Sequence, residues 1–169
     1  ASGGILYFNS KFPAEIPLES IKIDLTPERI QRGYYLANHV SMCVDCHSSR
    51  DWRYYSGPII EETLGKGGEM FNEEIANVPG TIYSKNITPT GVGTYTDGEL
   101  LRAITCGINK DGVALFPLMP YVHYREMARE DIYSIIAYLR TMKPIANEIP
   151  ERSLNFPVNF LVKQTPSPA

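Results

Sequence analysis

One stretch, Cys43-Val44-Asp45-Cys46-His47, constrains the architecture of this 169-residue chain more than any other. Two thiols three positions apart can each add to one vinyl group of the same haem, and the next residue then presents an imidazole to the iron. We therefore interpret Cys43 and Cys46 as the covalent attachment points of one haem c, and His47 as a ligand of its iron.

Two other kinds of site use the same cysteine spacing. A thioredoxin-like thiol pair requires a βαβ setting, which the surrounding sequence lacks. A zinc site requires further ligands, for which Cys106, His39 and His123 are the candidates, but the sequence has no second Cys-x-x-Cys and no histidine pair. Haem attachment is the favoured interpretation, and it leaves Cys106 as a small buried apolar residue.

The sequence on either side of the motif predicts helices. Upstream, Thr26 is a favourable N-cap and Pro27 suits the first helical position, so a helix leads into the motif. Downstream, Thr96 and Glu99 form a capping box that begins a second helix, and apolar residues at helical spacing predict a third from about Arg129. No alternating pattern is long enough for a sheet, so we predict an all-α chain of about three to five helices.

Two details of the first and third helices follow from their sequences. Gly33 allows these helices to approach closely, with Tyr34 and Tyr138 packing between them. The third helix follows Ala128, which lacks the oxygen of a polar N-cap, and this weakens that end by about 1 kcal/mol.

The long stretch between the first two helices, from about Ser48 to Thr96, is predicted to be loop because glycine and proline interrupt it repeatedly. A loop of this length needs something other than secondary structure to organise it, and a bound haem supplies that. Residues 61–77 hold five Glu and three Gly. We interpret them as a solvated insertion in preference to a docking loop.

The second face of the iron is either filled by a protein ligand or left open. The candidates are the methionines and the remaining histidines, namely Met42, Met70, Met119, Met127, Met142, His39 and His123. Met119 is favoured, because prolines on both sides of it hold the thioether with little entropy to lose. Ligation by Met119 makes the iron six-coordinate and restricts it to electron transfer. An open position would instead indicate a haem enzyme or a gas-binding sensor.

The motif and several other segments together resemble class I cytochrome c domains. These segments are Gly80–Pro89, Gly107–Gly112 and Leu115–Tyr121. They are most similar to the haem domains of the cytochrome subunits that accept electrons from membrane-bound alcohol and aldehyde dehydrogenases of bacteria. The similarity runs from about Thr26 to Val162.

This resemblance implies the class I cytochrome c fold, in which helices surround one covalent haem and long loops line it. It also implies that His47 and Met119 are the axial pair. Asn86, Ile87 and Thr88 would line the haem near its propionates.

Three residues after the motif are further candidates for binding the cofactor. Pro58 resembles the proline of class I cytochromes whose carbonyl accepts the second ring N–H of the ligating histidine, a contact that orients the ring. Arg50 and Trp52 could meet the propionates, and the alternative for Arg50 is a solvated surface charge.

The domain organisation follows from these assignments. We expect an extended arm over residues 1–25 and a monohaem cytochrome domain over 26–144. A C-terminal extension over 145–169 packs on the domain, with a frayed end.

Composition and resemblance together indicate the partners. The net charge is −3 and the Lys and Arg residues are scattered along the sequence, so no basic patch is expected that would bind nucleic acid. No segment approaches the roughly 20 apolar residues that cross a bilayer. The resemblance implies the periplasmic side of the bacterial inner membrane and redox partner proteins, either a dehydrogenase or an oxidase or other respiratory complex. A membrane anchor would belong to a missing N-terminal segment.

Overall fold

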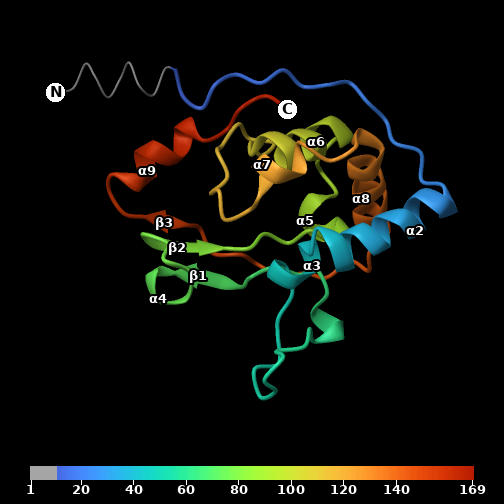
Figure 1. The fold of residues 1–169 in the computed structure, drawn as a ribbon, viewed down its shortest axis with the longest axis horizontal. Coiled ribbons are helices and arrows are strands. Elements are labelled where there is room, and N and C mark those ends of the chain that lie inside the picture. The colour runs from blue at the N-terminus through green and yellow to red at the C-terminus, as the bar shows by residue number, and fades with distance from the viewer. Residues whose placement is uncertain (1–10) are drawn as a thin grey trace. The chain divides into compact units, whose positions relative to one another are not determined.

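The structure is a computed structural model, drawn as a ribbon in Figure 1, and it describes residues 11–169. Residues 1–10, the first part of the predicted arm, lie outside the described residues. The chain forms two compact units. The motif unit, which holds the cysteine motif, comprises Ile23–Thr94 and Arg129–Asn155, and the tail unit comprises the segment up to Lys22, Tyr95–Ala128 and Phe156–Ala169.

The helix predicted to lead into the motif is present in the motif unit. It is α2 (Pro27–Tyr35), and the hydroxyl oxygen of Thr26 accepts a hydrogen bond from the Arg29 N–H at 3.3 Å. Thr26 is therefore the N-cap that the sequence predicts. The chain continues through a π-helical turn, Leu36–Val40, to the one-turn helix α3 (Cys43–Cys46).

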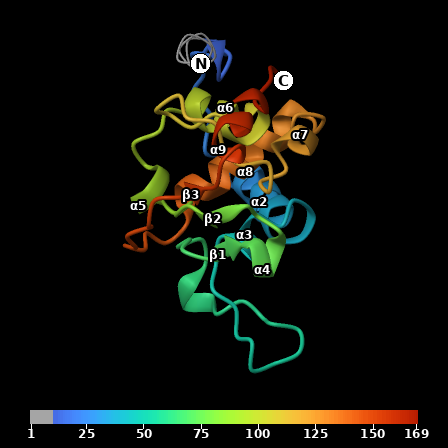
Figure 2. The same cartoon turned by 90° about the vertical axis from the view of Figure 1, so that its left-hand side faces the viewer.

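The third predicted helix, α8 (Arg129–Thr141), packs against α2 within the motif unit, as Figures 1 and 2 show. A Cβ added at Gly33 would collide with the carbonyl oxygen of Ser134. The rings of Tyr34 and Tyr138 meet edge to face, with centroids 5.5 Å apart. Both expectations for this helix pair are confirmed: glycine permits the close approach, and the aromatic rings fill the space beside it.

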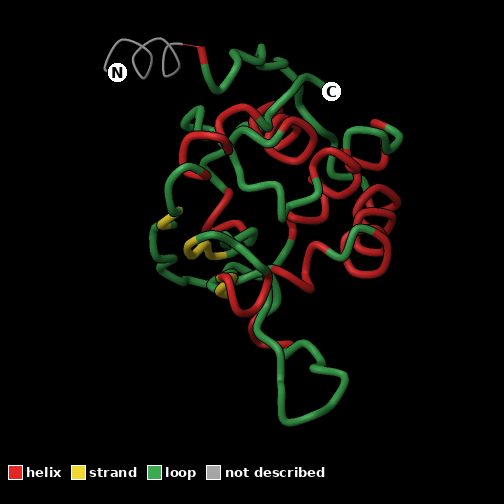
Figure 3. The backbone as a smooth tube through the Cα atoms, turned by 60° about the vertical axis from the view of Figure 1, so that its left-hand side comes forward, coloured by secondary structure: helices red, strands yellow, loops and turns green. Residues whose placement is uncertain are grey.

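The motif unit also contains a small antiparallel sheet, so the prediction of an all-α chain was wrong. Its strands, in the order β1-β2-β3, are Met70–Asn72, Gly80–Tyr83 and Ser153–Leu154. They appear in yellow in Figure 3. Strands of three, four and two residues are too short to show an alternating pattern in sequence. Gly80, with φ of 113°, allows the backbones of β2 and β3 to lie close together.

Short helical turns complete the motif unit. They are the 3₁₀ turn Glu61–Thr63, α4 (Glu73–Ala76) and α5 (Pro89–Val92). The Asn72 side chain caps α4 by accepting the Ile75 N–H at 3.0 Å. Residues 61–77, interpreted from the sequence as a solvated insertion, therefore belong to the folded unit and contribute a strand to its sheet.

The tail unit contains the second predicted helix, α6 (Asp97–Cys106). Thr96 Oγ1 accepts the Glu99 N–H at 3.2 Å, and the Glu99 carboxylate accepts the Thr96 N–H at 2.7 Å. The helix ends at Gly107, whose φ of 76° is the left-handed conformation that favours glycine. The capping box and the glycine stop are thus confirmed. Cys106 lies buried with Ile16 and Ile108, as its predicted apolar role requires.

The remaining elements of the tail unit are α7 (Tyr121–Tyr124), α9 (Val158–Leu161) and the 3₁₀ turn Val162–Gln164. Tyr121 is fully buried, and its hydroxyl donates to Thr165 Oγ1 at 2.7 Å. The Arg125 guanidinium donates to the Ser167 hydroxyl. The C-terminal end, predicted to be frayed, is therefore held against its unit. No helix among residues 11–169 is long and apolar enough to cross a membrane.

Candidate functional site

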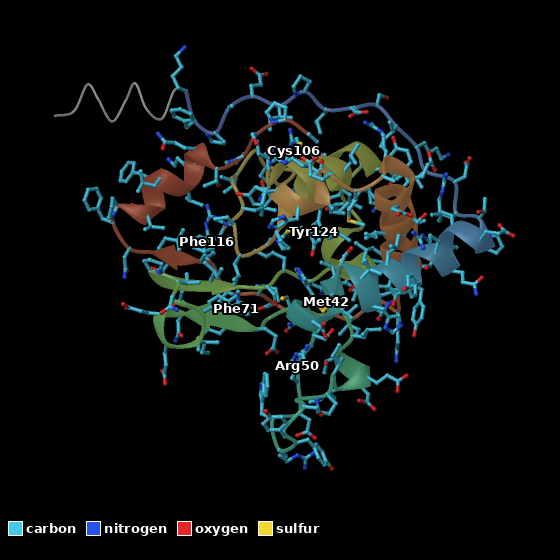
Figure 4. All side chains as sticks on the ribbon, in the orientation of Figure 1. Met42, Arg50, Phe71, Cys106, Phe116 and Tyr124 are labelled. Atoms are coloured by element: carbon cyan, nitrogen blue, oxygen red, sulfur yellow. The ribbon has the colours of Figure 1, made fainter. Side chains whose placement is uncertain are left out.

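The two cysteines of the motif lie one turn apart on α3. Residues three positions apart share a face of a helix, so both thiols project from the same side. Met42, labelled in Figure 4, makes a left-handed turn with φ of 49° directly before α3. The His47 N–H donates to the Cys43 carbonyl at 3.2 Å and closes the turn. This arrangement fits the attachment of both sulfurs to one haem.

His47 is oriented by a backbone carbonyl from a distant segment. Its Nδ1 lies 2.5 Å from the carbonyl oxygen of Lys85. A carbonyl can only accept, so Nδ1 carries the proton and Nε2 keeps the lone pair that binds a metal ion. Burial lowers the pKa of His47, and the hydrogen bond to Lys85 opposes this only in part. The neutral imidazole is the form that ligates iron.

In this structure the contact comes from Lys85 and not from Pro58. The Pro58 carbonyl accepts the Asp51 N–H at 2.8 Å, while the His47 ring donates to Lys85. Pro58 lies in an exposed loop whose backbone groups hydrogen-bond to one another, whereas Lys85 lies next to the buried Asn86.

The segment after Lys85 is anchored by buried hydrogen bonds. Asn86 Nδ2 donates to the Ile145 carbonyl at 2.7 Å. Asn86 Oδ1 accepts from both the backbone N–H and the hydroxyl of Thr88, at 2.9 and 2.7 Å. Both side chains are buried, so these bonds fix the backbone beside the histidine. Asn86 and Thr88, predicted as haem-lining residues, thus lie in the segment that contacts His47.

A second segment holds the backbone of the motif, and sequence reasoning missed it. The Gly67 N–H donates to the His47 carbonyl at 2.8 Å, and the Gly65 N–H donates to the buried Ser48 hydroxyl at 2.9 Å. A Cβ at Gly67 would lie 2.5 Å from the Lys85 carbonyl carbon, so only glycine fits there. The closely spaced glycines of this segment were the available signal, since such runs mark close backbone approach.

The electrostatics of the thiols oppose a redox-active thiol pair. Burial raises the pKa of Cys43 to about 12 and also raises the pKa of Cys46. Redox-active pairs instead depress a thiol pKa to generate a thiolate. Neither cysteine is in a disulfide. Among residues 11–169, no three His, Cys, Asp or Glu side chains are grouped in a way that could hold a metal ion.

The favoured second ligand, Met119, lies in a constrained turn of the tail unit. Its N–H donates to the Phe116 carbonyl at 3.1 Å, and its own carbonyl accepts the Tyr121 N–H at 2.8 Å. The Leu115 N–H donates to the Gly107 carbonyl at 2.7 Å and ties the loop to the end of α6. The backbone N–H and carbonyl of Met119 are thus both hydrogen-bonded, and the residue is half-buried.

Arg50 and Trp52 lie in the loop that follows the motif. The Arg50 guanidinium pairs with Asp45 at 2.5 Å and donates to the Gly57 carbonyl at 2.7 Å. Trp52 is 72% exposed. Figure 4 labels Arg50 at the base of this loop. These contacts give Arg50 a role within the loop and do not support the expected propionate contact of either residue.

Comparison with known proteins finds relatives over most of the chain. The cytochrome c subunit of the quinone alcohol dehydrogenase of Gluconacetobacter polyoxogenes is 34% identical over 135 residues, which are 78% of this chain and 26% of the relative. The fructose dehydrogenase cytochrome subunit of Gluconobacter japonicus is 36% identical over 136 residues, which are 78% of this chain and 25% of that protein. The chain belongs to the c-type cytochromes. The resemblance inferred from the motif and its flanking segments is thereby confirmed.

This cytochrome matches only part of each relative. The gluconate 2-dehydrogenase cytochrome c subunit of Pantoea cypripedii is 31% identical over 135 residues, which are 78% of this chain and 27% of that protein. The chain thus spans about a quarter of the length of these relatives. No model of an established protein family matches it.

Proposed function

We propose that this cytochrome binds one haem c through Cys43 and Cys46, takes His47 and Met119 as axial ligands, and transfers single electrons. The observation that carries the proposal is the hydrogen bond from His47 Nδ1 to the Lys85 carbonyl. It leaves Nε2 as a neutral, oriented ligand, the arrangement typical of metal-bound histidine.

The haem, when bound, supplies the one-electron chemistry, and the residues of the chain supply its setting. If His47 supplied a nitrogen and Met119 a thioether to the iron, no position would be left for oxygen or substrate, and the soft sulfur would favour ferrous iron. The alternative is a haem enzyme or gas sensor with an open position. The constrained backbone around Met119 favours the closed site, because little entropy is lost when the thioether binds.

The segment around Asn86 is proposed to line the haem. Asn86 and Thr88 are held by buried hydrogen bonds, and Ile87 between them donates its N–H to the Gly65 carbonyl at 2.9 Å. This backbone therefore stays in place beside His47. We assign the single haem to the domain predicted over residues 26–144.

The partners are proposed from the relatives. Three of these are cytochrome subunits of alcohol, fructose and gluconate dehydrogenases. We infer that this cytochrome is a non-catalytic carrier that exchanges electrons with such a dehydrogenase or with a respiratory complex. Its place is the periplasmic side of the bacterial inner membrane.

Intact mass and absorption spectrum of the purified protein test this proposal. We expect a mass that exceeds that of the polypeptide by one haem. We also expect the α band of the reduced protein to be that of a haem whose two vinyl groups have both been converted to thioether links. A colourless protein, or a mass increase of two haems, contradicts the proposal.

A further inference from the structure

The small sheet brings a glycine-rich stretch, residues 65–68, to the carbonyl that orients the proposed iron ligand. We name this stretch the glycine segment. It comes directly before β1, and Lys85 comes directly after β2. The two strands pair antiparallel and lie side by side in Figure 1, so the start of one strand meets the end of the other. The pairing continues past the strands, because the Gly68 N–H donates to the Ser84 carbonyl at 2.9 Å. The glycine segment therefore lies beside the acceptor of the His47 ring.

The glycine segment is also hydrogen-bonded to the backbone that carries the ring. The Gly67 N–H donates to the His47 carbonyl at 2.8 Å, and the Gly65 N–H donates to the buried Ser48 hydroxyl at 2.9 Å. On the acceptor side, the Gly65 carbonyl accepts the Ile87 N–H at 2.9 Å. The segment thus joins the donor and the acceptor of the contact that orients the imidazole.

Gly67 lies directly against the Lys85 peptide. A Cβ at Gly67 would come within 2.5 Å of the Lys85 carbonyl carbon and 2.6 Å of its oxygen, so a methyl group there must displace this carbonyl. The carbonyl oxygen lies 2.5 Å from His47 Nδ1, at the short end of the range for hydrogen bonds from nitrogen to oxygen. Displacing the carbonyl therefore lengthens the contact.

A side chain from the segment after α8 holds the glycine segment in place. Asn147 Nδ2 donates to the carbonyls of Lys66 and Gly67, both at 3.2 Å. The same atom lies 3.0 Å from the position that a Cβ at Gly68 would take. Asn147 is partly buried, so these bonds are shielded from competing water. The distance between the glycine segment and Lys85 thus depends on Asn147 as well as on Gly67.

We propose that Gly67 and Asn147 are positioning residues that set the distance between His47 Nδ1 and the Lys85 carbonyl oxygen, and through it the reduction potential of the haem iron. A strong hydrogen bond from Nδ1–H increases the electron density that Nε2 donates to a metal ion. Such a ligand favours ferric iron and lowers the potential, so lengthening the bond raises the potential. The effect on the potential rests on the function proposed above, whereas the positioning of the ring does not.

Gly67→Ala tests the proposal, with Gly112→Ala as the matched control. The two glycines have φ of 71° and 76°, so both substitutions impose a similar backbone cost, but a Cβ at Gly112 meets nothing within 4 Å. The first readout is the rate at which the His47 Nδ1 proton exchanges with solvent, followed by NMR of the reduced protein labelled with ¹⁵N-histidine. It reports the hydrogen bond whether or not haem is present. The second readout is the reduction potential, measured by redox titration.

We expect Gly67→Ala to speed the exchange about tenfold relative to Gly112→Ala, the factor that corresponds to the loss of one ordinary hydrogen bond. It should also raise the potential, so that the ratio of ferrous to ferric protein at a fixed ambient potential increases severalfold. Asn147→Ala removes two hydrogen bonds without adding a collision, and should change both readouts in the same direction by a smaller factor. Its control is Asn72→Ala, which removes one bond from an exposed side chain of the same unit and should change neither.

Gly67→Ala and Asn147→Ala proteins that match their controls in both readouts overturn the proposal. If Gly67→Ala does not fold, Asn147→Ala decides by itself, and unchanged exchange and potential in that variant overturn the proposal. A colourless wild-type protein would refute the proposed function, while the exchange rate would still score the positioning of the ring. A haem-containing protein whose exchange is unaltered by Gly67→Ala would refute the positioning alone.

Discussion

The Nδ1–H of His47 donates to the carbonyl oxygen of Lys85 across 2.5 Å, although 38 positions separate the two residues in the chain. The contact orients the imidazole and leaves Nε2 available as a ligand. The carbonyl is held in place by its neighbour Asn86. The Asn86 side chain donates to the Ile145 carbonyl and accepts the Thr88 N–H. The geometry of the proposed iron ligand thus depends on a side chain outside the motif, that of Asn86.

Replacing Asn86 should therefore loosen the site. Asn86→Ala removes the bonds to Ile145 and Thr88 and leaves buried partners unpaired, which costs about 1–3 kcal/mol for each such group. Denaturant unfolding measures the loss of stability, and the reduction potential reports the change at His47. Asn72→Ala, which removes an exposed helix cap, is the control and should leave the potential unchanged. Equal potentials for the Asn86 variant and the wild type would contradict this role.

The contact between α2 and α8 predicts a strong effect at Gly33. A methyl group there collides with the backbone of Ser134, so Gly33→Ala forces the helices apart and costs about 1–3 kcal/mol. Gln31→Ala, on an exposed position of the same helix, should change stability by no more than about 0.5 kcal/mol. Thermal unfolding of the two variants distinguishes them. A Gly33→Ala protein as stable as the wild type would show that this close approach is absent in solution.

The leftover cysteine should matter for packing and not for the cofactor. Cys106 is buried with Ile16 and Ile108, so Cys106→Ser places a hydroxyl in an apolar cluster and destabilises the tail unit more than Cys106→Ala does. Haem content by intact mass should be unchanged in both variants. Loss of haem in Cys106→Ala would show that this thiol takes part in the site.

The motif cysteines should behave in the opposite way. Cys43→Ala and Cys46→Ala each remove one thioether, so one vinyl group of the haem stays unsaturated and the α band of the reduced protein shifts to longer wavelength. Both thiols project from one face of α3, so each variant can keep a single covalent link. Mass spectrometry under denaturing conditions counts the links. An unshifted α band in both variants would contradict attachment at this motif.

The elements that sequence reasoning predicted correctly have local causes. The caps at Thr26 and at Thr96 with Glu99 depend on hydrogen bonds between residues three positions apart, and such bonds can be read from a short window of sequence. The same holds for the left-handed stop at Gly107. The cysteine motif is likewise local, because its five residues are consecutive, and it therefore indicates haem attachment from the sequence alone.

The features that sequence reasoning missed have distant causes. The sheet depends on the pairing of β3 with β2, and α6 and α8 lie between these two strands in the sequence. None of its strands is long enough to show an alternating pattern. The acceptor at Lys85 is a backbone carbonyl, so no side-chain type marks it in the sequence. The order of residues 51–58 similarly arises from backbone turns that the composition of this loop does not reveal.

The absorption spectrum of the Met119→Ala protein tests the central claim most directly, with Met70→Ala, at a partly exposed strand position, as the control. The account predicts a wild-type spectrum of low-spin iron that does not bind carbon monoxide when reduced, and the same spectrum for Met70→Ala. Met119→Ala should change to high-spin iron that binds carbon monoxide. A low-spin spectrum in Met119→Ala, indistinguishable from wild type, would contradict the assignment of Met119 and with it the closed, six-coordinate electron carrier.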